Sequence, residues 1–103
     1  AMDEVAKYLK YNTLEIRDDV IKMVAGDEID ITIDDEFRAG QGEPRTKEEI
    51  YSAMIVLGFL SYYDGYLKIP KKELMKEFEK ALRDMLILLS IQEEEMIRHL
   101  LLN

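Results

Sequence analysis

Residues 58–74 read GFLSYYDGYLKIPKKEL, and the way this stretch turns the chain decides the fold. An apolar helix is expected to end at Asp64 and Gly65, because a glycine after an apolar run is a usual helix end. Residues 66–69 then predict a short strand. Pro70 keeps the residue before it extended and suits the first turn of a helix, so a new helix is expected to open there.

Two capping signals upstream of this stretch predict the starts of further helices. Asn12 is followed by an acid three residues on, and Gly26 predicts the end of that helix. Thr46 begins the same signal before residues 50–60, which are apolar around nearly the whole circumference and predict a central buried helix. The inner face predicted for the first helix consists of Leu14, Val20, Ile21 and Val24.

Residues 28–34 alternate between isoleucines and polar side chains, which predicts a half-buried strand with one wet face. Because an isolated pair of short strands is marginal in water, this strand and residues 66–69 should pair with each other. Lys68 would then point outward among Asp30 and its acidic neighbours. Residues 37–45 contain two glycines and a proline without periodicity, so they are expected to form a loop.

The chain after residue 70 carries another apolar stripe. Its predicted inner residues are Leu74, Phe78, Ala81 or Leu82, Met85 and Leu89. Ser90 begins one more capping signal, so a break near Ser90 and a last helix are expected. Residues 85–89 are apolar on every side and three leucines stand near the C-terminus. We expect this excess of apolar surface to contact a neighbouring domain, or a second copy of the chain.

Together these elements predict a mainly α protein with a small two-stranded β-sheet, an α+β domain of the winged-helix-like kind. The 103 residues suffice for a single domain, 1–103, and 48% hydrophobic with 35% charged residues is typical of a folded protein. The residues predicted to form the core are Ile50, Met54, Leu57, Leu67, Ile69, Leu74 and Phe78.

Composition argues against several classes of protein. The chain has no cysteine, which excludes a disulfide framework and thiolate metal sites. This absence, with no apolar targeting segment at the N-terminus, favours a cytoplasmic protein. The longest apolar run, residues 53–60, is too short to cross a bilayer. Ala1 is expected to be a remnant of cloning, and the chain to be a piece of a longer one.

No motif predicts a catalytic, cofactor or metal site, so the chain is not expected to be an enzyme. No glycine is followed by lysine as in a phosphate-binding loop, and no acid stands two residues before a lysine as in a restriction-type nuclease core. His99 is the single histidine and has no second histidine with which to hold a metal. One acidic run lacks the spacing of a calcium loop and suits a solvated strand edge: Asp27, Glu28, Asp30, Asp34, Asp35 and Glu36.

One basic pattern would suit nucleic acid. It consists of Lys68, Lys71, Lys72, Lys76 and Lys80, the last three at spacings of four on one helix face. Interleaved acids favour ordinary ion pairs on the helix surface instead, namely Glu73–Lys76, Glu77–Lys80 and Glu79–Arg83. The net charge of −8 also disfavours contact with phosphates. The six tyrosines suit base stacking, and equally a core rim or an interface.

Residues 48–82, EEIYSAMIVLGFLSYYDGYLKIPKKELMKEFEKAL, resemble part of a large bacterial family of AAA-ATPase-like proteins that end in a PD-(D/E)XK nuclease-like domain. In that family a segment of this form, with an Ile-Pro-Asn-Lys-Glu motif after the short strand, connects the two parts. The likeness covers about residues 3–84, with Lys71 in place of the usual asparagine, and leaves 85–103 as a C-terminal helical extension.

This resemblance implies a non-catalytic interdomain connector or interaction module, with no catalytic residue to carry over. Its partners would be the neighbouring ATPase-like and nuclease-like domains, and a second copy could pair with the isolated chain through the apolar C-terminal helix. A winged-helix-like nucleic-acid-binding module that uses the lysine-rich helix face is the alternative.

Overall fold

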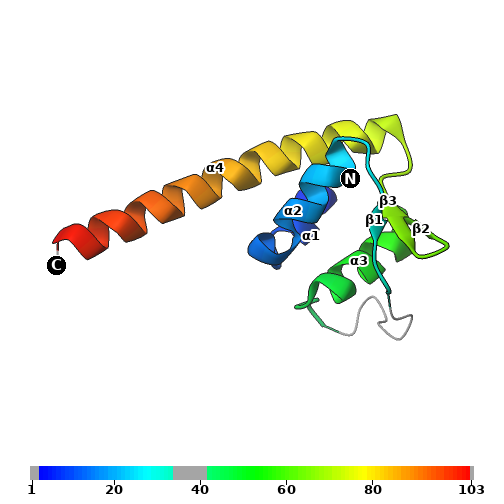
Figure 1. The fold of residues 1–103 in the computed structure, drawn as a ribbon, viewed down its shortest axis with the longest axis horizontal. Coiled ribbons are helices and arrows are strands. Elements are labelled where there is room, and N and C mark those ends of the chain that lie inside the picture. The colour runs from blue at the N-terminus through cyan, green and yellow to red at the C-terminus, as the bar shows by residue number, and fades with distance from the viewer. Residues whose placement is uncertain (1–2, 34–41, 103) are drawn as a thin grey trace.

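The computed structural model describes residues 3–33 and 42–102. Its elements, in chain order, are α1 (Asp3–Leu9), α2 (Thr13–Val24), β1 (Ile29–Asp30), α3 (Lys47–Val56), β2 (Ser61–Tyr63), β3 (Tyr66–Lys68) and α4 (Lys72–Leu102). In Figure 1, α4 packs across α1 and α2 and then runs past them, while α3 and the small sheet lie together at the other end of the molecule. The predicted α+β class is confirmed, and the winged-helix-like arrangement stays a prediction.

The sheet has three antiparallel strands in the order β1-β3-β2. The predicted pairing of the isoleucine strand with β3 is confirmed, since Ile29 lies opposite Leu67. The prediction of two strands is wrong, because β2 occupies a segment that was expected to be helical. Asp64 and Gly65 have φ values of 54° and 84°, and two successive positive φ values form the type I′ turn that closes tight hairpins. An Asp-Gly pair is a strong hairpin signal, so the hairpin of β2 and β3 could have been predicted from the sequence.

Helix α3 ends at Val56, earlier than predicted, and Gly58 stops it just beyond the C-cap. Gly58 has a φ of 84°, and its N–H donates to the Ile55 carbonyl at 3.0 Å, while the Phe59 N–H donates to the Met54 carbonyl at 2.8 Å. These two bonds form the Schellman motif that satisfies the last carbonyls of a helix. The early end leaves Leu57 42% exposed, so its predicted place in the core is wrong.

Strand β1 is shorter than the predicted strand 28–34 because a side chain takes over part of the hydrogen bonding. The Tyr62 hydroxyl donates to the Ile31 carbonyl at 2.8 Å and accepts from the Ile33 N–H at 3.3 Å. The predicted alternation continues beyond the ladder, with Ile29 and Ile33 buried and Thr32 exposed. The predicted strand end at residue 34, and the part of the predicted loop up to residue 41, lie outside the described residues.

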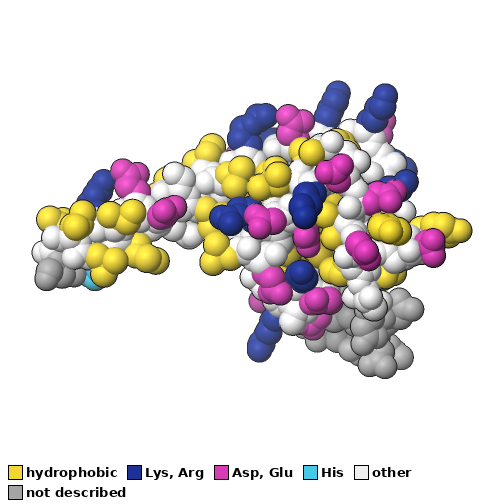
Figure 2. Space-filling model, viewed as in Figure 1, with side chains coloured by type: hydrophobic (Ala, Val, Ile, Leu, Met, Phe, Trp, Pro, Cys, Tyr) yellow, Lys and Arg dark blue, Asp and Glu magenta, His cyan; other side chains and the backbone are white. Residues whose placement is uncertain are grey.

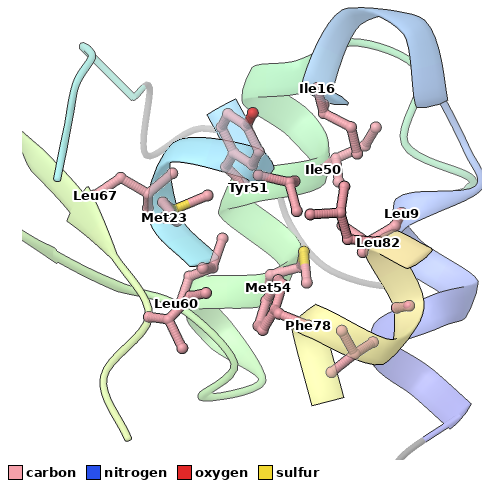
Figure 3. Packing of buried hydrophobic residues seen from close by; sticks show 14 of the residues in the cluster. Leu9, Ile16, Met23, Ile50, Tyr51, Met54, Leu60, Leu67, Phe78 and Leu82 are labelled. Carbon is pink, nitrogen blue, oxygen red and sulfur yellow. The ribbon is translucent and has the colours of Figure 1, made fainter. Parts of the chain in front are cut away.

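The core surrounds α3, as the sequence predicted. The capping box at its start is confirmed: the Glu49 N–H donates to Thr46 Oγ1 at 3.1 Å, and Glu49 Oε1 accepts from the Thr46 N–H at 3.1 Å. Figure 3 shows the buried cluster formed by residues of α3 with side chains of α1, α2, β3 and α4. Predicted core residues that are buried are Ile50, Met54, Leu67, Ile69 and Phe78, and Leu74 is partly buried against them.

The inner face of α2 differs from the prediction. Leu14 is 71% exposed and Ile21 is 40% exposed, whereas Ile16, Val20 and Met23 are buried. Val20 belongs to both sets, and each residue advances about 100° around a helix, so the observed inner face is turned from the predicted one by about 100°, the step of one residue. Helix α1 had not been predicted at all, although its two fully buried residues stand four positions apart as a helical face requires.

Helix α4 begins at Lys72, two residues after Pro70, and runs unbroken to Leu102, so the predicted break near Ser90 is wrong. Neither glycine nor proline occurs within the helix, and leucine, methionine and glutamate favour helix strongly. The predicted inner face of its first half is confirmed: Phe78, Ala81, Leu82 and Met85 are buried, and Leu74 and Leu89 are partly buried. Every residue from 90 to 102 is exposed.

Candidate functional site

The most prominent surface feature of the described residues is the C-terminal part of α4, residues 86–102, here called the α4 arm. Its exposed apolar side chains are Leu86, Ile87, Leu88, Ile91, Met96, Ile97, Leu100, Leu101 and Leu102. Leu101 and Leu102 are each 79% exposed. Figure 2 shows hydrophobic side chains along both edges of the projecting arm. A helix that is apolar around most of its circumference is normally covered, so the α4 arm has the character of a docking element.

The arm is helical although it packs on little of the body. Isolated helices of this length are marginal in water, because the first turn is costly to form. The first half of α4 is already docked on α1 and α2, so the helix only has to be extended from there. An ion pair between Arg98 and Glu94, 3.6 Å long and one turn apart, adds a small contribution on the surface.

One side of α4 carries a heptad pattern, here called the arm seam. Its members are Leu82, Leu86, Leu89, Glu93, Met96 and Leu100, at alternating spacings of four and three. This spacing keeps one stripe of side chains facing a partner helix. Leu82 is only 9% exposed, so the arm seam starts inside the core of the body and continues onto the free arm. Sequence reasoning missed this pattern because it placed a break at Ser90, in the middle of the heptads.

A groove lies where the arm leaves the body, and we call it the base groove. It has a volume of about 410 Å³ and is lined by Lys10, Tyr11, Asn12, Thr13, Leu14, Leu88, Leu89 and Gln92. A smaller hollow of about 160 Å³, which shares Leu88 with it, reaches between α1 and α4. The base groove therefore joins the exposed Leu14 of α2 to Leu88 and Leu89 of the arm.

The five lysines of the alternative nucleic-acid site, Lys68, Lys71, Lys72, Lys76 and Lys80, are all exposed. Those within α4 lie on the side away from the buried Phe78. Of the three predicted ion pairs, Glu79–Arg83 is formed at 3.6 Å. Within the part of the chain that the structure describes, Lys76 and Lys80 have no ion pair, so the other two predicted pairs are not formed.

Lys68 is exposed, as predicted, and the acid beside it is Glu28, one of the acidic neighbours of Asp30, and not Asp30 itself. Asp30 lies opposite Tyr66 in the ladder, whereas Lys68 shares a shallow recess with Glu28. The lysines on the sheet and on the helix therefore do not form one continuous basic surface free of acids.

A second groove, of about 500 Å³, lies between α1 and the first half of α4. Lys7, Lys10 and Lys80 line it together with Glu77 and Asp84. Three ammonium groups and two carboxylates share the rim, so the groove presents no single sign of charge to a ligand. It does not favour a phosphate or a metal ion over water.

Tyr51 is a fully buried residue of the core that carries a polar group. Its hydroxyl donates to Asp19 Oδ2 at 2.8 Å, and burial, followed by this hydrogen bond, raises the pKa of Tyr51 above its ordinary value. The hydroxyl is thus held protonated as a donor between α3 and α2. Of the tyrosines, Tyr63 at the hairpin is 82% exposed, whereas Tyr51 is part of the core as the sequence reading favoured.

Among the residues described, no group of three or more histidine, cysteine, aspartate or glutamate side chains is placed to hold a metal ion. Part of the acidic run, residues 34–36, lies outside the described residues. Within the described ranges, no helix has both the length and the apolar character needed to span a membrane.

Comparison with known proteins gave no match to a family model, to a curated protein or to a solved structure.

Proposed function

We propose that this chain is a non-catalytic connector and interaction module of a cytoplasmic AAA-ATPase-like protein that also has a nuclease-like domain. The resemblance of residues 48–82 to such connectors supplies the family. The α4 arm carries the interaction role, because it offers exposed apolar side chains on a helix that is anchored in a packed core. A module of this kind positions other domains and leaves reactions to them.

The construction of α4 suits a connector. Its first half is held by buried residues such as Phe78 and Met85, and the same helix continues to Leu102 without a break. A displacement of the arm is therefore transmitted to the body through one rigid element of 31 residues. Its partner should offer an apolar face, since the arm gains most from removing leucine, isoleucine and methionine side chains from water.

The first test is to read the sequence of the complete reading frame that contains this chain. It should encode a phosphate-binding loop upstream and an acidic nuclease-type motif downstream. A reading frame with neither motif contradicts the proposed parent protein.

The second test is binding. The chain is titrated by calorimetry with the ATPase-like and nuclease-like domains produced from the same reading frame. Exchanging Ile87 and Ile91 for serine, on the side of the arm away from the arm seam, should weaken binding at least about tenfold. Ser90→Ala on the same helix is the matched control and should leave binding unchanged. Equal affinity for both variants, or no binding by the unchanged chain, contradicts the proposal.

Nucleic-acid binding is a second candidate because Lys76 and Lys80 are exposed and, within the described residues, lack the predicted acidic partners. Fluorescence anisotropy with duplex and single-stranded oligonucleotides at low salt tests it. Micromolar binding that weakens steeply with salt and disappears in the variant with Lys72→Glu and Lys76→Glu supports this candidate. Binding that is absent, or insensitive to salt, rules it out.

A further inference from the structure

We infer that the arm seam pairs with the arm seam of a second copy of this chain, in an antiparallel coiled coil whose tips enter the base grooves. This pairing rests on the proposed docking role of the α4 arm and adds the identity of one partner. Five of the six seam residues are leucine or methionine. A stripe that repeats every seven residues packs best against a helix with the same repeat, because each knob needs a hole at the same spacing. A second copy supplies that repeat.

The one charged seam residue sets the orientation. In a parallel, in-register pair, Glu93 would face Glu93 of the other copy across an apolar layer. Two carboxylates in such a layer repel each other, and burial disfavours their charged forms. In an antiparallel pair Glu93 meets a different residue, and its carboxylate can reach water at the edge of the seam. Antiparallel pairing is therefore favoured.

The body of the protein selects the register. In an antiparallel coiled coil each layer joins an a position of one helix to a d position of the other. Leu100 of one copy can therefore lie against Leu82, Leu89 or Met96 of the other. Leu82 is 9% exposed and already covered by the body, which blocks the first register. Pairing Leu100 with Met96 leaves only the last turns of the helices in contact. The register with Leu100 against Leu89 keeps the most layers without a clash, and it sets Glu93 against Met96.

The base groove fits this register. With Leu100 beside Leu89 of the other copy, the exposed tip of the arm reaches the groove that Leu14, Leu88 and Leu89 line. The groove volume of about 410 Å³ has room for more than one leucine side chain. Symmetry provides this contact twice, which extends a helix pair whose seam layers would otherwise run only about 17 Å, from residue 89 to residue 100. An interface of this small size is expected to have a dissociation constant of micromolar order.

Analytical ultracentrifugation of the whole 103-residue chain tests the pairing. The unchanged chain should sediment as a dimer at roughly 100 µM, well above a micromolar dissociation constant. Met96→Asp should convert it to a monomer with unchanged helicity, because Met96 is 64% exposed and no body residue depends on it for packing. Ile91→Asp, a matched change on another side of the arm, should leave the dimer intact. A monomeric unchanged chain, or equal behaviour of the two variants, overturns the pairing.

Disulfide trapping tests the orientation and the register, and the absence of native cysteine makes the readout clean. Chains with Leu89→Cys and chains with Leu100→Cys are oxidised separately and as a mixture. The antiparallel register brings Cα atoms of positions 89 and 100 within the roughly 4.4–6.8 Å that a disulfide allows. Only the mixture should form covalent dimers. Dimers from either variant alone indicate a parallel pair, and no dimers in the mixture overturn the register.

The connector role and the pairing of two copies can be contradicted independently of each other. Loss of self-association in Met96→Asp with unchanged binding of the neighbouring domains supports both of them. A chain that stays monomeric yet binds those domains through Ile87 and Ile91 retains the connector role and overturns the pairing.

Discussion

The hydroxyl of Tyr51 lies 2.8 Å from the Asp19 carboxylate and joins α3 to α2 across the edge of the core. The ring of Tyr51 is fully buried, whereas Asp19 is partly exposed. The aromatic ring therefore fills the core, and the hydroxyl is satisfied by a carboxylate that still reaches water. This bond links α2 to α3 in the observed rotation of α2, which sequence periodicity alone misjudged.

Tyr51→Phe should keep the ring in place and remove this bond. We expect the free energy of unfolding to fall by about 1 to 2 kcal/mol, since Asp19 can be rehydrated when it loses its donor. Urea denaturation followed by circular dichroism measures the change. Tyr63→Phe is the control, because that ring is 82% exposed, and it should have no effect. Equal stability of the Tyr51 variant and the unchanged chain would show that the bond contributes nothing.

Tyr51 also predicts how stability depends on alkaline pH. Its folded-state pKa is raised above the ordinary 10.0, first by burial and then by the bond to Asp19. The unfolded chain releases this proton near pH 10 and the folded chain does not, so the contribution is complete below pH 10 and is lost as the pH rises above it. The loss should reach about 1.4 kcal/mol per pH unit. The difference in unfolding free energy between the unchanged chain and Tyr51→Phe, measured at pH 9 and pH 11, isolates this contribution from the other tyrosines.

The capping box predicts a loss of stability in acid. Hydrogen bonds, first from the Thr46 backbone, lower the pKa of Glu49 below 4.5 in the folded state. Its stabilising contribution is therefore present above pH 4.5 and is lost as the pH falls below that value. Glu49→Gln should lower the melting temperature at pH 7 and leave a smaller difference from the unchanged chain at pH 3.5. Differences of equal size at the two pH values would contradict a role for the charge.

The other half of the box gives a separate prediction. Thr46→Ala removes the acceptor of the Glu49 N–H, and a lost N-cap of this kind costs about 1 kcal/mol. Thr46→Ser keeps the acceptor and should retain nearly all of the stability. Chemical denaturation of the three chains measures their free energies of unfolding. A serine variant as unstable as the alanine variant would show that the threonine methyl group, and not the hydroxyl acceptor, provides the stability.

Local signals in the sequence predicted best those features that depend on a few neighbouring residues. The capping box at Thr46 and the helix end at Gly26 were predicted because each needs only the hydrogen bonds of one turn. The same reasoning failed at Ser90, where the residues before it are already helical and the backbone has no reason to leave the helix. A capping pattern predicts a helix start only where something else turns the chain.

The sequence predicted that the C-terminal part of the chain exposes an apolar surface, but not how the residues of that surface are arranged. The excess of apolar residues after residue 85 was visible in the sequence, and the structure leaves most of it exposed. The arm seam was not recognised, because its heptads become continuous only when α4 is unbroken at Ser90. Likewise, the base groove depends on where α2 lies against α4, a long-range contact that no local pattern encodes.

A last prediction concerns Gly58, which stops α3. Because the helix stops there, the following residues are free to form β2. Gly58 has a φ of 84°, and a Cβ added there would meet no atom within 4 Å, so a side chain would cost backbone strain and no clash. Gly58→Ala should destabilise the fold by about 1 to 2 kcal/mol, and Gly58→Asn by less, since asparagine tolerates left-handed backbone. Thermal melting ranks the three chains. An alanine variant as stable as glycine would mean that α3 can continue past residue 58, as the sequence alone had suggested, at the expense of β2.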